Sequence, residues 1–165
     1  MVSRDGTSPH GDERFEGSSG DAGRDVRRVN TPSNDRRLRT GVKALVTGAD
    51  RALLVKERHD DGSTFWTLPG GGLRPDERPA DGLRRELDEE LGCRVLVGEP
   101  LTSVWYHHRH TPAVTCYEVF DCSLLTEPAA ERMEGVIGYR WVPFESAPAS
   151  TLPQVRCLLR TTARR

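Results

Sequence analysis

The sequence has no long apolar run and no surplus of either charge. No segment approaches the roughly 18 apolar residues of a membrane-spanning helix, and the first residues, MVSRDGTSPHGDERFEG, lack the apolar stretch of a secretory signal. The 24 basic and 25 acidic residues leave a net charge of −1, which argues against a broad basic face for nucleic acid. We therefore expect a soluble cytoplasmic protein that has neither a membrane nor a nucleic acid as its partner.

Cysteine is also scarce. The four cysteines, at positions 93, 116, 122 and 157, form no C-x-x-C pair and show no spacing typical of a zinc site. This pattern favours reduced, mostly buried thiols over disulfides or a structural metal.

Apolar side chains are sparse at the amino-terminal end. Residues 1–40 contain seven of them, scattered without period among Gly, Ser, Asp and Arg. Such a segment cannot bury enough surface to offset an ordering entropy of about 1–2 kcal/mol per residue. We predict a disordered extension over residues 1–40, with a partner-binding arm as the alternative, and one folded domain over residues 41–165.

From residue 41 onward the sequence consists of short aliphatic runs separated by polar turns. The runs 42–48 and 52–58 flank Gly-Ala-Asp and predict a β-hairpin. Further strands are predicted at 65–68, 94–108, 113–125 and 138–144, and an amphipathic helix at 152–162. Strands dominate and helices are few, which indicates an α+β fold with a mixed β-sheet between helices.

Another helix is predicted after the glycine-rich loop at 69–72. Pro79 suits its first turn, leucines recur at three and four residues, and Gly92 suits a left-handed cap. Glu86, Glu89 and Glu90 then lie on one turn, beside the leucine face. Like charges at this spacing repel by roughly 0.2–0.5 kcal/mol per pair, so a bound cation explains the cluster better than the alternative, a solvated acidic face. Magnesium prefers oxygen ligands, and we predict Mg²⁺, with Mn²⁺ as a substitute.

The segment from Gly71 to Cys93 resembles the signature of the Nudix hydrolases, G-x5-E-x7-R-E-U-x-E-E-x-G-U, in which U is apolar. Seven of the nine fixed positions specify a single residue type, so the match is specific. Cys93 stands where the family usually carries an aliphatic residue, and a buried thiol can fill that place. The matching residues are Gly71, Glu77, Arg85, Glu86, Leu87, Glu89, Glu90, Gly92 and Cys93.

The resemblance implies a fold, a reaction and a set of roles. The fold is the Nudix α/β/α sandwich, and the reaction is magnesium-dependent hydrolysis of the diphosphate linkage in a nucleoside diphosphate joined to another group. Two groups of residues follow from it. The expected metal ligands are the Gly70 carbonyl and the carboxylates of Glu86, Glu89 and Glu90. The expected support consists of a Glu77–Arg85 ion pair and Gly71, which hold the loop against the helix.

The proton acceptor differs among members of the family. It is either the first glutamate of the helix, which corresponds to Glu86, or an acid in a later loop. Glu134 resembles that later acid, and Glu131 is its rival.

Residues that contact the substrate are expected on the strands near the loop. Lys56 and Arg58 alternate along one strand, and Arg58 resembles a basic position that touches phosphate in the family; the alternative is a solvated sheet edge. Trp105 and Tyr106 are candidates for stacking on a base, as is Trp66, although buried aromatics more often belong to the core. The nearby histidines, His107, His108 and His110, predict a polar loop near the pocket rather than a zinc site.

Two functions remain open at this point. The first is a pyrophosphohydrolase, which the complete set of acids favours. The second is a non-catalytic, nucleotide-sensing Nudix-fold domain, a class in which the acids are usually eroded. The substrates that fit the first function are ADP-ribose-like sugars, dinucleoside polyphosphates and nucleoside triphosphates. A homodimer is one option, because many members of the family pair.

Overall fold

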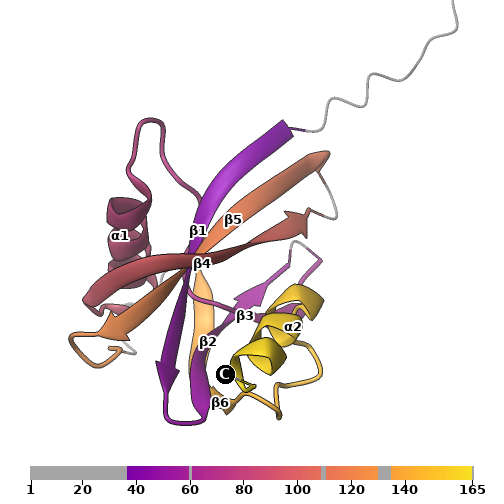
Figure 1. Cartoon of the computed structure of the whole chain (residues 1–165). Coiled ribbons are helices and arrows are strands. Elements are labelled where there is room, and N and C mark those ends of the chain that lie inside the picture. The colour runs from indigo at the N-terminus through magenta and orange to yellow at the C-terminus, as the bar shows by residue number, and fades with distance from the viewer. Residues whose placement is uncertain (1–36, 60, 109–110, 130–134, 165) are drawn as a thin grey trace, which may run out of the picture. The chain divides into compact units, whose positions relative to one another are not determined.

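The computed structural model describes residues 37–59, 61–108, 111–129 and 135–164. Residues 1–36, which make up most of the predicted disordered extension, lie outside the described residues. The described part of the chain contains two helices among its strands (Figure 1). The elements are β1 (Arg37–Gly48), β2 (Arg51–Arg58), β3 (Thr64–Thr67), α1 (Pro79–Leu91), β4 (Val95–His107), β5 (Ala113–Leu124), β6 (Val136–Pro143) and α2 (Pro153–Thr162).

Strand β1 begins four residues before the predicted domain boundary at Gly41. Residues 37–40 are all exposed, so no burial pattern marks them as a strand in the sequence. Their backbone instead pairs with β5, from Arg37 opposite Ala113 to Thr40 opposite Cys116. Ladder hydrogen bonds therefore extend the strand beyond its buried part, which is a contribution that side-chain patterns do not report.

The sheet is mixed, as the sequence predicts. Strand β1 runs parallel to β5, which pairs antiparallel with β4. Strand β2 pairs antiparallel with both β3 and β6. The predicted hairpin of β1 and β2 exists, but its strands share only two register pairs, Thr47 with Ala52 and Gly48 with Arg51, before they diverge.

The glycine-rich loop occupies the edge of β1 that β2 leaves open. The backbone amides of Ala44 and Val42 donate to the carbonyls of Pro69 and Gly71, at 2.9 Å each, and Leu73 donates back to β1 at 3.1 Å. A Cβ on Gly41 would lie 2.6 Å from the Gly71 oxygen and 2.5 Å from the Tyr117 ring. Glycine at position 41 therefore permits the close approach that fixes the loop along β1.

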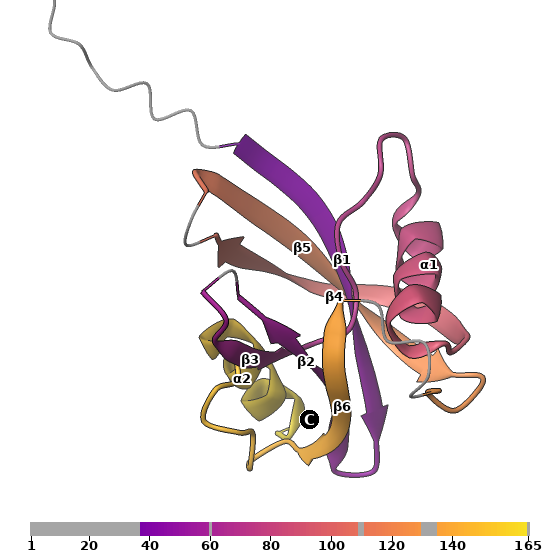
Figure 2. The same cartoon turned by 180° about the vertical axis from the view of Figure 1, so that it is seen from behind.

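The strands carry a buried layer on each face. Along β1, Val42, Ala44 and Val46 belong to a cluster with the leucines of α1, whereas Leu45 belongs to a cluster with α2. Strand β2 alternates in the same way. The two helices accordingly lie on opposite sides of the strands in Figure 1 and in the reverse view of Figure 2. This is the predicted α/β/α arrangement, and burial of both faces explains the continuous aliphatic runs of β1 and β2.

Helix α1 forms where the sequence predicts it. Pro79 occupies the first turn, and Gly92 caps the other end at φ 59°, in the left-handed region. Leu83, Leu87 and Leu91 are fully buried. Cys93 is also fully buried beside them, and burial raises the pKa of its thiol to about 11, so it packs as a small apolar residue.

The cysteines differ in burial. All four cysteines are free thiols, and Cys93 and Cys122 are buried, whereas Cys157 is exposed. Neither of the two described helices has the length and apolar character that crossing a membrane would require.

The packing of α1 leads to a stability prediction. Leu87→Ala should lower the free energy of unfolding by about 2–5 kcal/mol, because it leaves a cavity in the cluster between α1 and the strands. Leu38→Ala is the matched control, because Leu38 is 66% exposed and its loss should change stability by less than about 0.5 kcal/mol. Urea unfolding of both variants measures the difference, and equal costs would contradict the proposed core.

Candidate functional site

Arg85 joins the glycine-rich loop to helix α1. Its Nε and one terminal nitrogen donate to the two carboxylate oxygens of Glu77, at 2.7 and 2.8 Å, which is the ion pair that the sequence predicts. The same guanidinium donates to Glu86 at 2.8 Å, to Glu89 at 2.9 Å and to the Gly72 carbonyl at 3.1 Å. One side chain thereby fixes the loop and two glutamates of the helix relative to one another.

Glu77 is strongly stabilised as a carboxylate. Hydrogen bonds from Arg85 and from the backbone amide of Arg74 lower its pKa from 4.5 to about 2. The geometry is that of a structural anion, held at the start of the helix by a cation and an amide. With so low a pKa, Glu77 is a weak base, which is consistent with the supporting role that the sequence predicts.

Glu90 lies in a different environment from Glu86 and Glu89. It is only 8% exposed, and its carboxylate accepts a hydrogen bond of 2.8 Å from the backbone amide of Gly70. Burial raises its pKa to about 8, an effect that the nearby Lys43 ammonium and the Gly70 amide oppose. The predicted cluster therefore consists of two arginine-bound carboxylates and one buried carboxylate.

Lys43 is a site residue that the sequence analysis missed. It lies on β1 and is only 6% exposed. Its Nζ donates to the Gly70 carbonyl and lies 3.3 Å from a carboxylate oxygen of Glu57. Burial alone would lower the pKa of Lys43, but the charges of Glu57 and Glu90 outweigh burial and raise it. A lysine in the middle of the aliphatic run VKALV was the sequence signal that could have revealed it, because a charge in a doubly buried strand needs partners.

The glycines of the loop allow backbone and carboxylates to come together. Gly70 has φ 118°, and a Cβ there would lie 2.4 Å from the Val42 carbonyl oxygen. A Cβ on Gly71 would meet the Glu86 carboxylate at the same distance, 2.4 Å. Gly82 plays another part: a Cβ there would meet Leu73 at 2.5 Å and Glu77 at 3.0 Å, so this glycine makes room for the loop.

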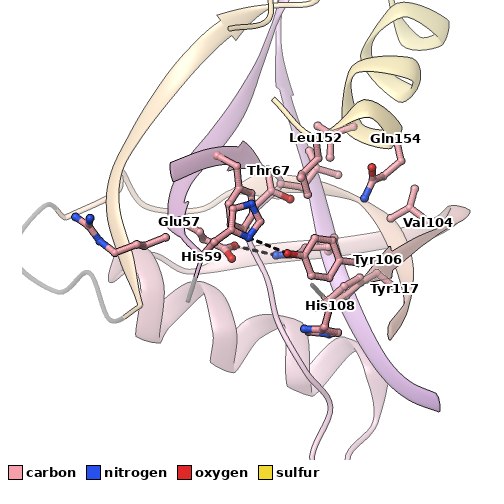
Figure 3. Close-up of a pocket in the computed structure, with 14 residues that line it drawn as sticks. Glu57, His59, Thr67, Val104, Tyr106, His108, Tyr117, Leu152 and Gln154 are labelled. Atoms are coloured by element: carbon pink, nitrogen blue, oxygen red, sulfur yellow. Dashed lines mark hydrogen bonds and ion pairs between the residues drawn. The ribbon is translucent and has the colours of Figure 1, made fainter. Parts of the chain in front are cut away.

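A pocket opens beside the loop, and it is lined from several elements (Figure 3). His59 and Tyr106 point toward one another across it, with 3.1 Å between the Tyr106 hydroxyl and His59 Nδ1. Phe65 stacks on His59 at a centroid distance of 4.0 Å. The pocket also receives Gln154 from the first turn of α2 and Lys43 from β1. It therefore combines an aromatic wall with charged and amide groups.

The predicted substrate residues divide into two sets. Arg58 and Tyr106 line the pocket, but Lys56 does not; its amine lies 5.9 Å from the ring centroid of Trp66 instead. Strand β2 keeps a regular register with β3 from Val55 to Arg58, and Glu57 lines the pocket beside Arg58. Trp105 is 53% exposed and lies outside the pocket lining.

The structure places Trp66 and two of the three nearby histidines. Trp66 is buried in the cluster with α2, so it is a core residue. His108 lines the pocket and contacts Thr115 Oγ1 at 2.9 Å, whereas His107 is exposed. His110 lies outside the described residues, as do both candidate loop acids, Glu131 and Glu134.

The donors on α1 fit a hard divalent cation in their chemistry. Glu86, Glu89, Glu90 and the Gly70 carbonyl offer only oxygen, and Gly71 allows the Glu86 carboxylate to touch the loop. Within the described part of the chain, no three side chains of His, Cys, Asp or Glu converge as a ready-made cage. Magnesium does not require one, because it usually keeps several waters and binds through one or two carboxylates plus substrate phosphates.

Comparison with known proteins decides the family. The model of the NUDIX domain matches residues 37–161 of this sequence. The chain belongs to the Nudix family. The match begins at the first residue of β1 and ends inside α2, so it covers the fold, the glycine-rich loop and the pocket together.

Individual relatives agree with this assignment. The chain is 36% identical to a nucleoside triphosphatase NudI of Escherichia coli over 98 residues, which cover 52% of this chain and 69% of that protein. Its fold is similar to a MutT NUDIX hydrolase from Burkholderia pseudomallei, with a TM-score of 0.66, 22% identity and coverage of 76% and 98% of the two chains. It is also similar to an ADP-ribose pyrophosphatase from Streptococcus suis, with a TM-score of 0.55, 20% identity and coverage of 77% and 92%.

These findings confirm two predictions. The first is the Nudix α/β/α fold, which the solved structures share. The second is the enzyme class, a Nudix pyrophosphohydrolase, which rests on the family match and the relatives together.

The Glu77–Arg85 pair leads to a prediction about acid stability. Because the pKa of Glu77 is lower in the folded protein than its ordinary value of 4.5, its contribution to stability is full above that value and is lost as the pH falls toward about 2. Glu77→Gln should therefore be less stable than the wild type at neutral pH, and the difference should shrink on acidification. Urea unfolding over a pH series measures it, and a gap that stays constant down to the acid limit would contradict the pairing.

Proposed function

We propose that this enzyme hydrolyses the diphosphate linkage of a nucleoside diphosphate joined to another group, in a reaction that depends on Mg²⁺ and accepts Mn²⁺. The observation that carries the proposal is the position of the glycine-rich loop. This loop lies between the carboxylates of α1 on one side and the aromatic pocket on the other, and Gly70 contacts both Glu90 and the pocket residue Lys43. A nucleotide whose base occupies the pocket would thus have its phosphates beside the acidic face.

The side chains of α1 would divide the work. Glu86, Glu89 and Glu90, with the Gly70 carbonyl, would hold the metal, and Arg85 keeps Glu86 and Glu89 in register with the loop. The bound metal would neutralise phosphate oxygens and lower the pKa of a water molecule. Glu86 is the candidate proton acceptor on the helix because its carboxylate touches the Gly71 backbone, and Glu134 is the candidate from the later loop.

The pocket is proposed to bind the nucleoside. His59, Phe65 and Tyr106 lie nearly parallel, with interplanar angles of 26°, 7° and 20° among their three pairs, so the pocket wall contains parallel aromatic faces. A planar base can stack on such a face. Gln154 uses its amide nitrogen on the Trp105 carbonyl, at 3.2 Å, which leaves its oxygen to accept from a base edge. Arg58, which also lines the pocket, is proposed to contact phosphate.

The choice of substrate can be tested on a panel. Nucleoside triphosphates, ADP-ribose-like nucleotide sugars and dinucleoside polyphosphates should each be incubated with and without Mg²⁺, and nucleoside monophosphate and pyrophosphate release should be followed. The NudI relative favours the triphosphates as the first compounds to test. Metal-dependent turnover of any panel member supports the proposal. Tight binding of these compounds without release of a monophosphate would support the sensing function instead.

Substitution of the helix acids tests their assignment. Glu86→Gln and Glu90→Gln should each lower turnover by about 10²-fold or more, because each replaces a carboxylate that is proposed to bind the metal. Glu99→Gln is the matched control, because Glu99 is an exposed glutamate on β4. Turnover is measured at saturating Mg²⁺ with circular dichroism as the check of folding. Wild-type rates in either helix variant would contradict the assignment.

The proton acceptor needs a separate comparison. If Glu134 accepts the proton, Glu134→Gln should lower turnover as strongly as Glu86→Gln while leaving Mn²⁺ binding by the substrate-free protein unchanged. If Glu86 accepts it, Glu134→Gln should retain most activity. The pH dependence of turnover in the two variants distinguishes these outcomes, because loss of the base removes the acid limb of the profile.

A further inference from the structure

The backbone of Gly70 is held on both sides of its Cα by buried ionisable side chains. Its amide donates to the Glu90 carboxylate on α1, and its carbonyl accepts from the Lys43 ammonium on β1. Glu90 is 8% exposed and Lys43 is 6% exposed, so water competes little for either bond. Gly70 itself has φ 118°, a backbone conformation that glycine adopts readily and other residues rarely adopt. Because glycine is also free to adopt other conformations, contacts with neighbouring side chains must fix the direction of its amide and carbonyl.

Lys43 is held in turn by groups from other strands. Glu57 on β2 lies 3.3 Å from its Nζ, and the ring centroid of Tyr117 on β5 lies 5.2 Å from it. Glu57 also lines the pocket. The ammonium therefore has a fixed location between the pocket, whose lining it joins, and the loop.

We propose that Lys43 is a positioning residue, which with Glu90 orients the backbone of Gly70 so that its carbonyl and the Glu90 carboxylate face the metal and the substrate phosphates. The proposal rests on the proposed function, because it assigns Lys43 a part in that same site. A carbonyl oxygen has two lone pairs, so the bond from Lys43 leaves one for another partner. Residues that hydrogen-bond to a metal ligand without touching the metal typically change metal affinity or activity by about 10–100-fold when they are removed.

A simpler role for Lys43 would be to neutralise Glu57. The Lys43 ammonium is buried and Glu57 is partly buried, so each needs the other as a counter-charge, and removing either partner is costly whatever the pair does. The two roles differ in one respect. Charge balance is restored when both Lys43 and Glu57 are made neutral, whereas the Gly70 carbonyl still lacks its donor in that double variant.

The experiment measures Mn²⁺ binding by the substrate-free protein with calorimetry, and turnover of an accepted nucleotide in parallel. Lys43→Met keeps the length of the side chain and removes the charge. We expect it to weaken Mn²⁺ binding by about 10–100-fold and to lower kcat by a similar factor. Arg51→Met is the matched control, because it removes an equal charge from an exposed position on β2, and it should bind Mn²⁺ as the wild type does.

The double variant Lys43→Met, Glu57→Gln decides between the two roles. Positioning predicts that it stays impaired in Mn²⁺ binding, even if its urea midpoint returns to that of the wild type. The double variant also tests the positioning role if Lys43→Met alone fails to fold, because it contains no unpaired Glu57 charge. Recovery of wild-type Mn²⁺ binding in the double variant, or unchanged binding in Lys43→Met, would overturn the proposal.

Mn²⁺ binding and turnover of the wild type show whether a negative result contradicts the role of Lys43 or the proposed function. If the wild type binds no Mn²⁺ and shows no metal-dependent turnover, the proposed function fails, and the role of Lys43 fails with it. If the wild type binds Mn²⁺ and the Lys43 variants bind it equally well, only the positioning role is wrong.

Discussion

The backbone of the glycine-rich loop runs along the free edge of β1, and the candidate site depends on that attachment. Ala44 and Val42 donate to the loop, and the loop donates back through Leu73. The attachment requires β2 to diverge from β1 after two register pairs, and it requires glycine at position 41, where a side chain would collide with the loop. Because the loop is fixed to the central strand, the start of α1 and the wall of the pocket are fixed with it.

Contacts with charged side chains then hold the glycine-rich loop in the position that backbone pairing gives it. On the exposed side, Arg85 gathers Glu77, Glu86, Glu89 and the Gly72 carbonyl around one guanidinium, a planar group with five donors in fixed directions. On the buried side, Lys43 holds the carbonyl of Gly70 and Glu90 holds its amide. The loop thus lies between two ionic networks, one partly hydrated and one nearly dry. Such rigid support is the condition under which oxygen ligands can be presented at defined positions.

The sequence predicted the parts of this molecule that repeat or that match a specific motif. The elements follow from periodicity, because β1, β2 and α1 bury strongly patterned faces, and the Glu77–Arg85 pair follows from the family signature. The start of β1 was misplaced because residues 37–40 are held by backbone pairing without burial. Lys56 was expected beside Arg58 in the substrate site, but its amine lies 5.9 Å from the ring centroid of Trp66 on β3, a cross-strand contact that alternation along one strand does not predict.

Lys43 shows most clearly why some residues of the candidate site could not be predicted from the sequence. Its partners, Glu57, Gly70 and Glu90, come from three different elements, and only the folded chain brings them together. No spacing of residues along the sequence predicts these contacts. Tyr106 and His59 are a second case, since their contact across the pocket joins β4 to the end of β2.

The central claim is that the carboxylates of α1 and the Gly70 carbonyl bind a divalent cation beside the phosphates of a nucleotide whose base lies in the aromatic pocket. A crystal of the wild-type protein soaked with Mn²⁺ and a nucleotide carrying a methylene bridge in place of the scissile oxygen tests it directly. The account predicts an anomalous Mn²⁺ peak within coordination distance of Glu86, Glu89 or Glu90 and of a phosphate oxygen. A nucleotide ordered in the pocket with no anomalous density at the acidic face would contradict it.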